Sequence, residues 1–145
     1  MSKIAIIVLA IFLFITGCTR SGTDENSVIE IRERMFMTQI QDIYLNANDF
    51  LGRTIQLEGI FLGMIWDGAS YNYVVRGFSD GCCGGNVGFE VLWPQGRPNQ
   101  FPENNSWVEA KGVLKLFQGD SSRNLYLELI SLNVLETRGA EIVWR

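Results

Sequence analysis

Two adjacent cysteines stand in a glycine-rich stretch of the sequence, SDGCCGGN at residues 79–86. The chain contains three cysteines, and this stretch holds two of them, Cys82 and Cys83. Thiolates favour zinc, copper(I) and similar soft metal ions, so the pair could bind such an ion. Outside the cytosol the same two residues could instead form a strained, readily reduced disulfide. A third interpretation is that both are reduced, partly buried small residues that line a tight turn. The sequence leaves all three open.

Few other residues could complete a site around this pair. The chain has no histidine, which excludes Ser-His-Asp and Cys-His catalysis and removes the commonest metal ligand. Structural zinc needs four ligands, and the nearest acids that could join the sulfurs are Asp80 and Glu90. Arg76 could lower a thiol pKa or bind a ligand carboxylate, or it could be a solvated arginine at the end of a strand. The scattered carboxylates form no paired acid–base arrangement, so we expect a protein that is not an enzyme.

The N-terminal segment predicts export from the cytosol. Lys3 precedes an apolar run from Ile4 to Ile15, which is shorter than the ~20 residues of a membrane span and has the length of a signal-peptide core. The residues ITGC that follow resemble the lipobox of bacterial lipoproteins. The resemblance implies cleavage before Cys18 and attachment of acyl chains such as palmitate to Cys18. The alternatives are an ordinary secretory signal and a short uncleaved anchor.

The predicted domain organisation follows from this segment. We expect residues 1–17 to be a lipoprotein signal peptide, residues 18–27 a lipidated flexible tether, and residues 28–145 one small β-barrel domain. The expected location is the extracytoplasmic face of the cell membrane. Loss of Lys3 with the signal takes the net charge from −4 to −5, and no basic stripe is present. We therefore expect no nucleic-acid partner, because nucleic acids require cations to neutralise their phosphates.

The periodicity of the domain predicts one short helix followed by about five strands. A strand-like lead-in at 28–32 precedes a helix whose apolar face carries Phe36, Ile40, Ile43 and Tyr44. Alternating apolar residues then recur in short segments, which favours an antiparallel barrel or sandwich. Gly59 and Gly112 lie inside two of the longer strands, where glycine marks a bend, and this favours a small, coiled barrel. The last residues, 140–145, could be an edge strand or a tail.

Three segments together resemble a known family: DIYLNANDFLGRTIQLEGIF, YNYVVRGFSDGCCGG and NSWVEAKGVL. They are similar to the soluble, OB-fold-like C-terminal domain of a largely uncharacterised bacterial family of permease subunits. The resemblance covers roughly residues 31–135 and implies an OB-like barrel with a permease-like membrane partner. It departs from the family after the cysteine pair, where the family has a carboxylate and this chain has GGN. The matching positions are Gly52, Gly59, Arg76, Cys82, Cys83, Trp107, Val108 and Gly112.

These observations predict a mostly β, OB-like five-stranded antiparallel barrel with one short N-terminal helix. We expect a lipid-anchored, non-catalytic binding or accessory domain whose Cys82–Cys83 loop is the metal or ligand site, and a transporter is its candidate partner. The cofactor is unknown, with zinc or another soft metal ion as the candidate. Arg76 and Trp66, the tryptophan we expect to be most exposed, are further candidate ligand-binding residues. The alternatives are a thiol–disulfide redox role and an envelope interaction module with structural cysteines.

Overall fold

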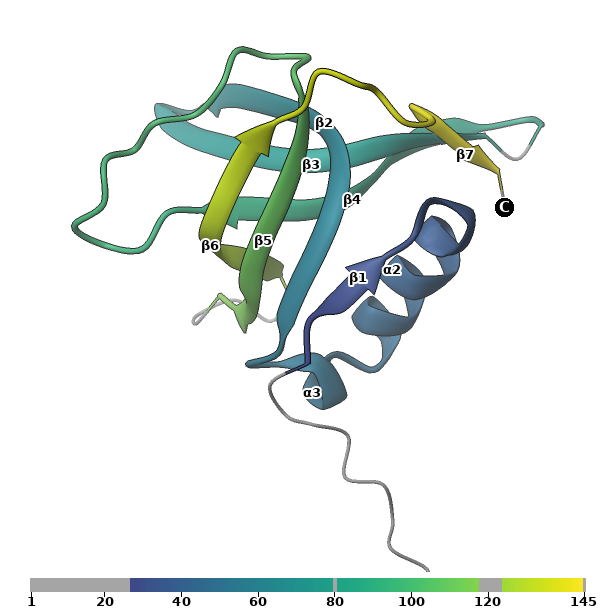
Figure 1. Ribbon diagram of the computed structural model, residues 1–145, viewed down its shortest axis with the longest axis horizontal. Coiled ribbons are helices and arrows are strands. Elements are labelled where there is room, and N and C mark those ends of the chain that lie inside the picture. Colours follow the sequence, from purple (N-terminus) through teal and green to yellow (C-terminus); the bar gives the residue numbers. More distant parts are fainter. Residues whose placement is uncertain (1–26, 80, 118–123, 145) are drawn as a thin grey trace, which may run out of the picture.

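The regular structure is mostly β-strand, built from residues that alternate between apolar and polar, as a half-buried sheet requires. The computed structural model describes residues 27–79, 81–117 and 124–144 (Figure 1). In chain order its elements are β1 (Ile29–Ile31), the 3-10 helix η1 (Glu33–Met35), α2 (Phe36–Leu45), α3 (Ala47–Phe50), β2 (Thr54–Trp66), β3 (Ala69–Ser79), β4 (Gly84–Leu92), β5 (Trp107–Leu116), β6 (Leu125–Val134) and β7 (Ile142–Trp144).

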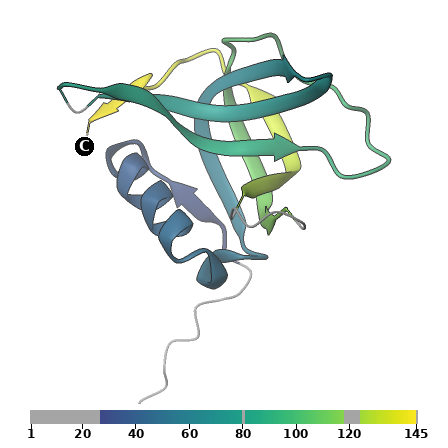
Figure 2. The ribbon, with the colours of Figure 1, turned by 180° about the vertical axis from the view of Figure 1, so that it is seen from behind.

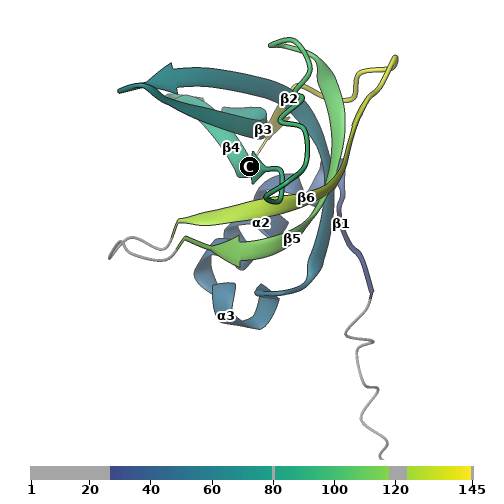
Figure 3. The same cartoon turned by 90° about the vertical axis from the view of Figure 1, so that its left-hand side faces the viewer.

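Five strands close into a barrel in the order β2-β3-β4-β6-β5, and β5 returns to β2. The β4–β6 pair is parallel and the other four pairs of the barrel are antiparallel. Figure 3 shows the β2–β3 hairpin and the β5–β6 pair extending toward the same side of the barrel. A closed barrel of five strands with a short preceding helix confirms the prediction of a mostly β, OB-like fold.

Two short strands extend the sheet beyond the barrel. β1 pairs in parallel with Ile55–Leu57 of β2, so the predicted lead-in strand is present. β7 pairs in parallel with Gly77–Ser79 of β3, which resolves the choice between an edge strand and a tail in favour of a strand. Each terminal segment of the domain is thus held by backbone hydrogen bonds to a long barrel strand.

The helix α2 lies beside the barrel, on the side over which the β3–β4 hairpin extends (Figure 2). Phe36, Ile40 and Ile43 are buried and join the barrel residues in one hydrophobic core, as the periodicity predicted. Tyr44, on the same predicted face, keeps 39% of its surface exposed because it lies at the rim of the contact. The helix therefore contributes to the core of the barrel and does not form a separate unit.

The two mid-strand glycines mark bends, as predicted. A Cβ on Gly59 would lie 2.6 Å from the Val75 carbonyl oxygen, so β2 could not approach β3 this closely with a larger residue. The register between β5 and β6 shifts between Lys111 and Gly112, which places Gly112 at a bulge. These bends allow strands of 13 and 10 residues to curve around a small barrel.

The proline-containing segment between β4 and β5 folds back onto the barrel surface. The indole Nε1 of Trp93 donates a hydrogen bond to the Gln100 carbonyl at 3.0 Å. Phe101 stacks on Phe61, with ring centroids 5.4 Å apart. Trp93 is half-buried and packs against the core.

Candidate functional site

Cys82 and Cys83 lie at the tip of the β3–β4 hairpin, the arm that reaches furthest to the right in Figure 1. β3 and β4 remain paired out to Ser79 and Gly84, and the two cysteines lie between these positions in the chain. Both cysteines are exposed, and their sulfur atoms lie 3.3 Å apart. This is a contact between two thiols, since a disulfide requires ~2.05 Å. The interpretation that the pair is partly buried is therefore wrong.

The hairpin tip is supported along both edges of β3. β4 pairs with one edge, and β7 pairs with the other edge at Gly77–Ser79. The Gly77 amide also donates to the Glu141 carbonyl at 2.8 Å. The Phe78 ring lies so close to Gly85 that an added Cβ would be 2.9 Å from it. The thiols thus stand at the end of a three-stranded ribbon, which fixes their position relative to the barrel.

The predicted carboxylate ligands do not complete a metal site within the described residues. Glu90 lies six residues along β4 from Gly84, which is about 20 Å at ~3.3 Å per residue, and it pairs with Tyr73. The strand register therefore separates Glu90 from the cysteines, contrary to the prediction that it could join them. Asp80 lies outside the described residues. Among the residues that the structure describes, no group of three or more Cys, Asp or Glu side chains could hold a metal ion.

Arg76 is buried, with 2% of its surface exposed, so the interpretation as a solvated arginine at a strand end is wrong. It lies within β3, three residues before Ser79 and about 10 Å along the strand from the hairpin tip. Burying a guanidinium is costly unless its donors are satisfied and its charge is paired. Its partners therefore define its role.

Arg76 fills a gap along one edge of β2. β1 pairs with that edge up to Leu57, and β3 pairs with the same edge from Ile60 onward. The Glu58 carbonyl lies between the two pairings, and Arg76 Nε donates a hydrogen bond to it at 2.8 Å. The side chain thus supplies the partner that neither strand provides to this backbone group.

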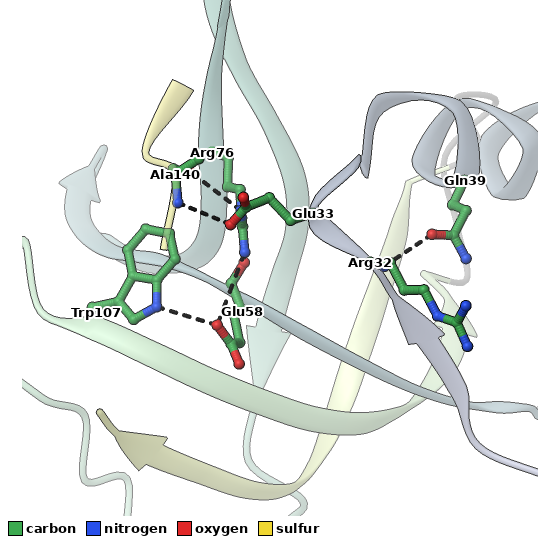
Figure 4. Close-up of polar contacts among 7 residues, drawn as sticks. All are labelled: Arg32, Glu33, Gln39, Glu58, Arg76, Trp107 and Ala140. Carbon is green, nitrogen blue, oxygen red and sulfur yellow. Dashed lines mark hydrogen bonds and ion pairs between the residues drawn. The ribbon is translucent and has the colours of Figure 1, made fainter. Parts of the chain in front are cut away.

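The guanidinium also joins the two ends of the domain (Figure 4). Its Nη1 donates to Glu33 Oε2 at 3.1 Å and to the Ala140 carbonyl at 3.1 Å. Ala140 N donates in turn to Glu33 Oε2 at 3.0 Å. The guanidinium carbon lies 4.9 Å from the Phe36 ring centroid and 4.8 Å from that of Trp107, within cation–π range of both. We call Arg76, Glu33, Glu58, Trp107 and Ala140 the arginine clasp.

The electrostatics of the clasp are those of a stabilised ion pair. The backbone hydrogen bond from Ala140 and the side-chain hydrogen bond from Arg76 lower the pKa of the Glu33 carboxyl from its ordinary value of 4.5. Glu58 lies 4.0 Å from Arg76 Nη2 and accepts a 3.4 Å hydrogen bond from the Trp107 indole. These contacts give the buried charge two carboxylate neighbours, so removal of Arg76 would leave both carboxylates without their cation.

A polar pocket of about 200 Å³ lies beside the clasp. Four glutamates and Arg76 are among the residues that line it, but Glu33 and Glu58 are already engaged by Arg76. Gln56 donates a 2.9 Å hydrogen bond to Glu109, another lining residue. The lining groups thus largely satisfy one another, and the pocket offers no separate chemistry.

The sequence did not identify the partners of Arg76. Glu33 is 43 residues before it and Ala140 is 64 residues after it, so no local spacing connects them. The one available signal was Arg76 itself, a cation in a strand whose neighbours Val74 and Val75 are apolar. A charge in such a strand needs a partner, and only the tertiary structure shows which one.

Trp66 is exposed over 72% of its surface, as predicted, and lies at the end of β2. It pairs with Ala69 at the beginning of β3, whereas the cysteines follow the end of that strand. Eleven residues of β3 separate the two, which is about 36 Å of extended chain. The structure therefore places Trp66 and the cysteine pair at opposite ends of β3, in two different sites.

The predicted lipidation site, Cys18, and the predicted signal peptide lie outside the described residues. So do most residues of the predicted tether. No helix in the described part of the chain is long and apolar enough to cross a bilayer.

Comparison with known proteins identifies the domain. The family described as the DUF1980 C-terminal domain matches residues 19–140, which is most of the chain. Among curated proteins, none matches the sequence. The matched range contains the barrel, the arginine clasp and the cysteine hairpin.

Proposed function

Because the chain belongs to the DUF1980 C-terminal domain family, which is uncharacterised, we propose its function from its own site. We propose that it is a non-catalytic binding domain, held at the extracytoplasmic face of the cell membrane by a lipid on Cys18. The binding element is the dithiol of Cys82 and Cys83, and the ligand is a soft metal ion.

The observation that carries this proposal is the position of the two thiols. They are adjacent, exposed and 3.3 Å apart, at the tip of a hairpin that is supported by a third strand. A buried structural cysteine would pack in the core, whereas these side chains stand where a ligand can reach them. Two thiols this close together could, once deprotonated, bind one ion between them.

The number of ligands favours a monovalent soft ion. Structural zinc takes four ligands, and the described residues supply only the two sulfurs at this tip. Copper(I) is among the soft ions that thiolates select, and it does not require the four ligands of structural zinc. A pair of sulfurs at an exposed tip leaves a bound ion accessible to further ligands, which suits a domain that passes an ion to or from a membrane partner.

The sequence supports the membrane location and the partner. Lys3, the apolar run Ile4–Ile15 and the ITGC sequence favour lipidation at Cys18. The polar residues from Thr19 to Ser27 would tether the barrel near the bilayer. The resemblance to permease subunits supports a permease-like membrane protein as the partner.

The test is a copper(I) competition experiment on the full-length chain in detergent with a non-thiol reductant. We expect about one ion per chain to be withdrawn from the chromogenic chelator bicinchoninate, and none to be withdrawn by the Cys82→Ser, Cys83→Ser double variant. Cys18→Ala is the matched control and should bind as the parent does. Equal copper uptake by the parent and the double variant would exclude the hairpin as the site.

The contact between the sulfurs also favours a second candidate, a thiol–disulfide role. In that reaction Cys82 and Cys83 would lose two protons and two electrons to form a disulfide, while a partner disulfide is reduced to two thiols. Thiol labelling of protein taken directly from the membrane, with and without reductant, tests this. Full labelling before reduction would argue against a stable vicinal disulfide.

A further inference from the structure

The outer face of the barrel carries a group of aromatic rings distant from the cysteine hairpin. Tyr71 and Tyr73 alternate along β3 with the buried residues Asn72 and Val74, so they face outward. The same alternation turns Tyr126 of β6 outward between buried leucines, and Glu90 of β4 outward between Phe89 and Val91. These outward residues are not part of the hydrophobic core.

The strand register brings these residues together. Tyr73 pairs with Glu90 across β3 and β4, and Glu90 pairs with Tyr126 across β4 and β6. One step along the face, Tyr71 pairs with Met64 of β2, and Trp66 is two residues beyond Met64. The Phe117 ring extends the row, with its centroid 4.4 Å from that of Tyr126. We define the ring platform as Met64, Trp66, Tyr71, Tyr73, Glu90 and Tyr126.

The ring platform is accessible and its shape is held by the barrel. Trp66 and Met64 are 72% and 49% exposed, and the other four residues are half-buried. Asp67 and Gly68 both have positive φ, at 50° and 77°, as in the tight two-residue turn that joins paired strands. The turn holds Trp66 at the edge of the platform, where its exposed ring is accessible to a ligand.

The charge of the platform restricts the ligand. Among the described residues, Lys115 is the one cation that pairs directly with a residue of the platform, Tyr126. Its ammonium lies 2.6 Å from the Glu128 carboxylate. A carboxyl group, Glu90, lies at the centre, and burial raises its pKa. A polyanion such as a nucleic acid requires unpaired cations and would be repelled by this carboxylate. The face therefore suits a neutral ligand that is both ring-stacking and rich in hydroxyl groups.

We propose that the ring platform binds a neutral oligosaccharide. Sugar rings present C–H faces that pack on aromatic side chains, and their hydroxyls can hydrogen-bond the Glu90 carboxyl and the tyrosine hydroxyls. The platform occupies the face and first hairpin that OB-folds use to bind oligonucleotides and oligosaccharides, and the Glu90 carboxyl favours the uncharged class. This site is separate from the dithiol and does not depend on the proposed metal function.

The test is titration of the full-length chain with two probes, N-acetylglucosamine hexamer and cellohexaose, in a detergent that carries no sugar. Calorimetry and tryptophan fluorescence report binding, since Trp66 is the exposed indole on the platform. We expect Trp66→Ala and Tyr73→Ala each to weaken binding by roughly fivefold or more, because each removes one stacking ring. Glu90→Gln should have a smaller effect, because the amide keeps one acceptor.

The matched control is Val134→Ala, which removes a side chain that is 61% exposed at the end of β6, eight residues along the strand from Tyr126. It should bind as the parent does, and so should the Cys82→Ser, Cys83→Ser variant, which separates this site from the metal site. Absence of binding to both sugars at millimolar concentration would overturn the proposal. So would equal binding by the platform variants, or tighter, salt-dependent binding of a dodecamer of deoxythymidine.

Discussion

Arg76 and the Cys82–Cys83 pair come from the same short segment of sequence, yet the fold uses them in opposite ways. Arg76 is 2% exposed and is held by Glu33, Glu58 and Ala140. Six residues later the cysteines are exposed at the tip of a hairpin. The clasp joins the ends of the domain to the barrel, whereas the tip contributes little buried surface.

This contrast shows that residues close together in one sequence motif can have unrelated structural roles. In the barrel wall, Arg76 of β3 donates a hydrogen bond to the Glu58 carbonyl at the edge of β2. Beyond the wall, β3 continues into the ribbon that it forms with β4 and β7. A residue on the wall is constrained by its contacts, whereas the cysteines at the tip are exposed beyond the wall. The following changes test this division, from the largest expected effect on stability to the smallest.

Replacing Arg76 by alanine should cause the largest loss. The change leaves the Glu58 carbonyl without its donor and Glu33 without its cation, and we expect the free energy of unfolding to fall by about 3 kcal/mol. Urea denaturation of the full-length chain, followed by far-UV circular dichroism, measures this. The control is Arg97→Ala, an exposed arginine beside Trp93, which should change stability by less than ~0.5 kcal/mol. Equal stability of the two variants would mean that the clasp does not hold the fold.

Gly139→Ala should have an intermediate effect. The added Cβ would lie 2.9 Å from Glu33 Oε2 and 3.0 Å from the Trp107 ring, so the clasp must shift to accept it. We expect a loss of about 1–2 kcal/mol in the same denaturation experiment. Gly96→Ala provides a comparison without steric conflict, because no atom lies within 4 Å of the added Cβ. Its φ of +85° means that any loss of stability in this variant comes from backbone strain. A Gly139 variant as stable as the parent would show that the clasp is loosely packed.

Glu33→Gln should produce a pH-dependent loss of about 1 kcal/mol or less, because the carboxylate is half-exposed. The folded state lowers the Glu33 pKa below 4.5, so the stability it contributes is present above pH 4.5. That contribution is lost as the pH falls through the folded-state pKa. Denaturation midpoints measured from pH 7 to pH 3 should show the parent and the variant converging at low pH. A constant difference across this range would contradict the ion pair.

The Cys82→Ser, Cys83→Ser double change should have the smallest effect on stability, within ~0.5 kcal/mol, because both side chains are exposed. The same variant should lose copper(I) binding completely. A large destabilisation would mean that the tip contributes to the fold, and the contrast with Arg76 would then fail.

Much of the fold could be predicted because its signals are local. Alternation identified the barrel strands, and the helical spacing of Phe36, Ile40 and Ile43 identified α2. Gly59 and Gly112 indicated the bends because few other residues permit such close strand contacts. The residues around the cysteine pair were less predictable. Glu90 is only seven positions from Cys83 in the sequence, but the extended strand β4 carries it away from the hairpin tip.

The sequence by itself determined the strand pattern, the short helix and the presence of two neighbouring thiols without a histidine to assist them. Alternation and residue type are properties of neighbouring positions, so they can be read directly from the chain. Only the tertiary structure decided that Arg76 is buried, that Glu33 and Ala140 are its partners, and that the rings of β2, β3 and β6 share one face. These relations depend on barrel closure and strand register, which bring together residues as far apart as Glu33 and Ala140, 107 positions from one another.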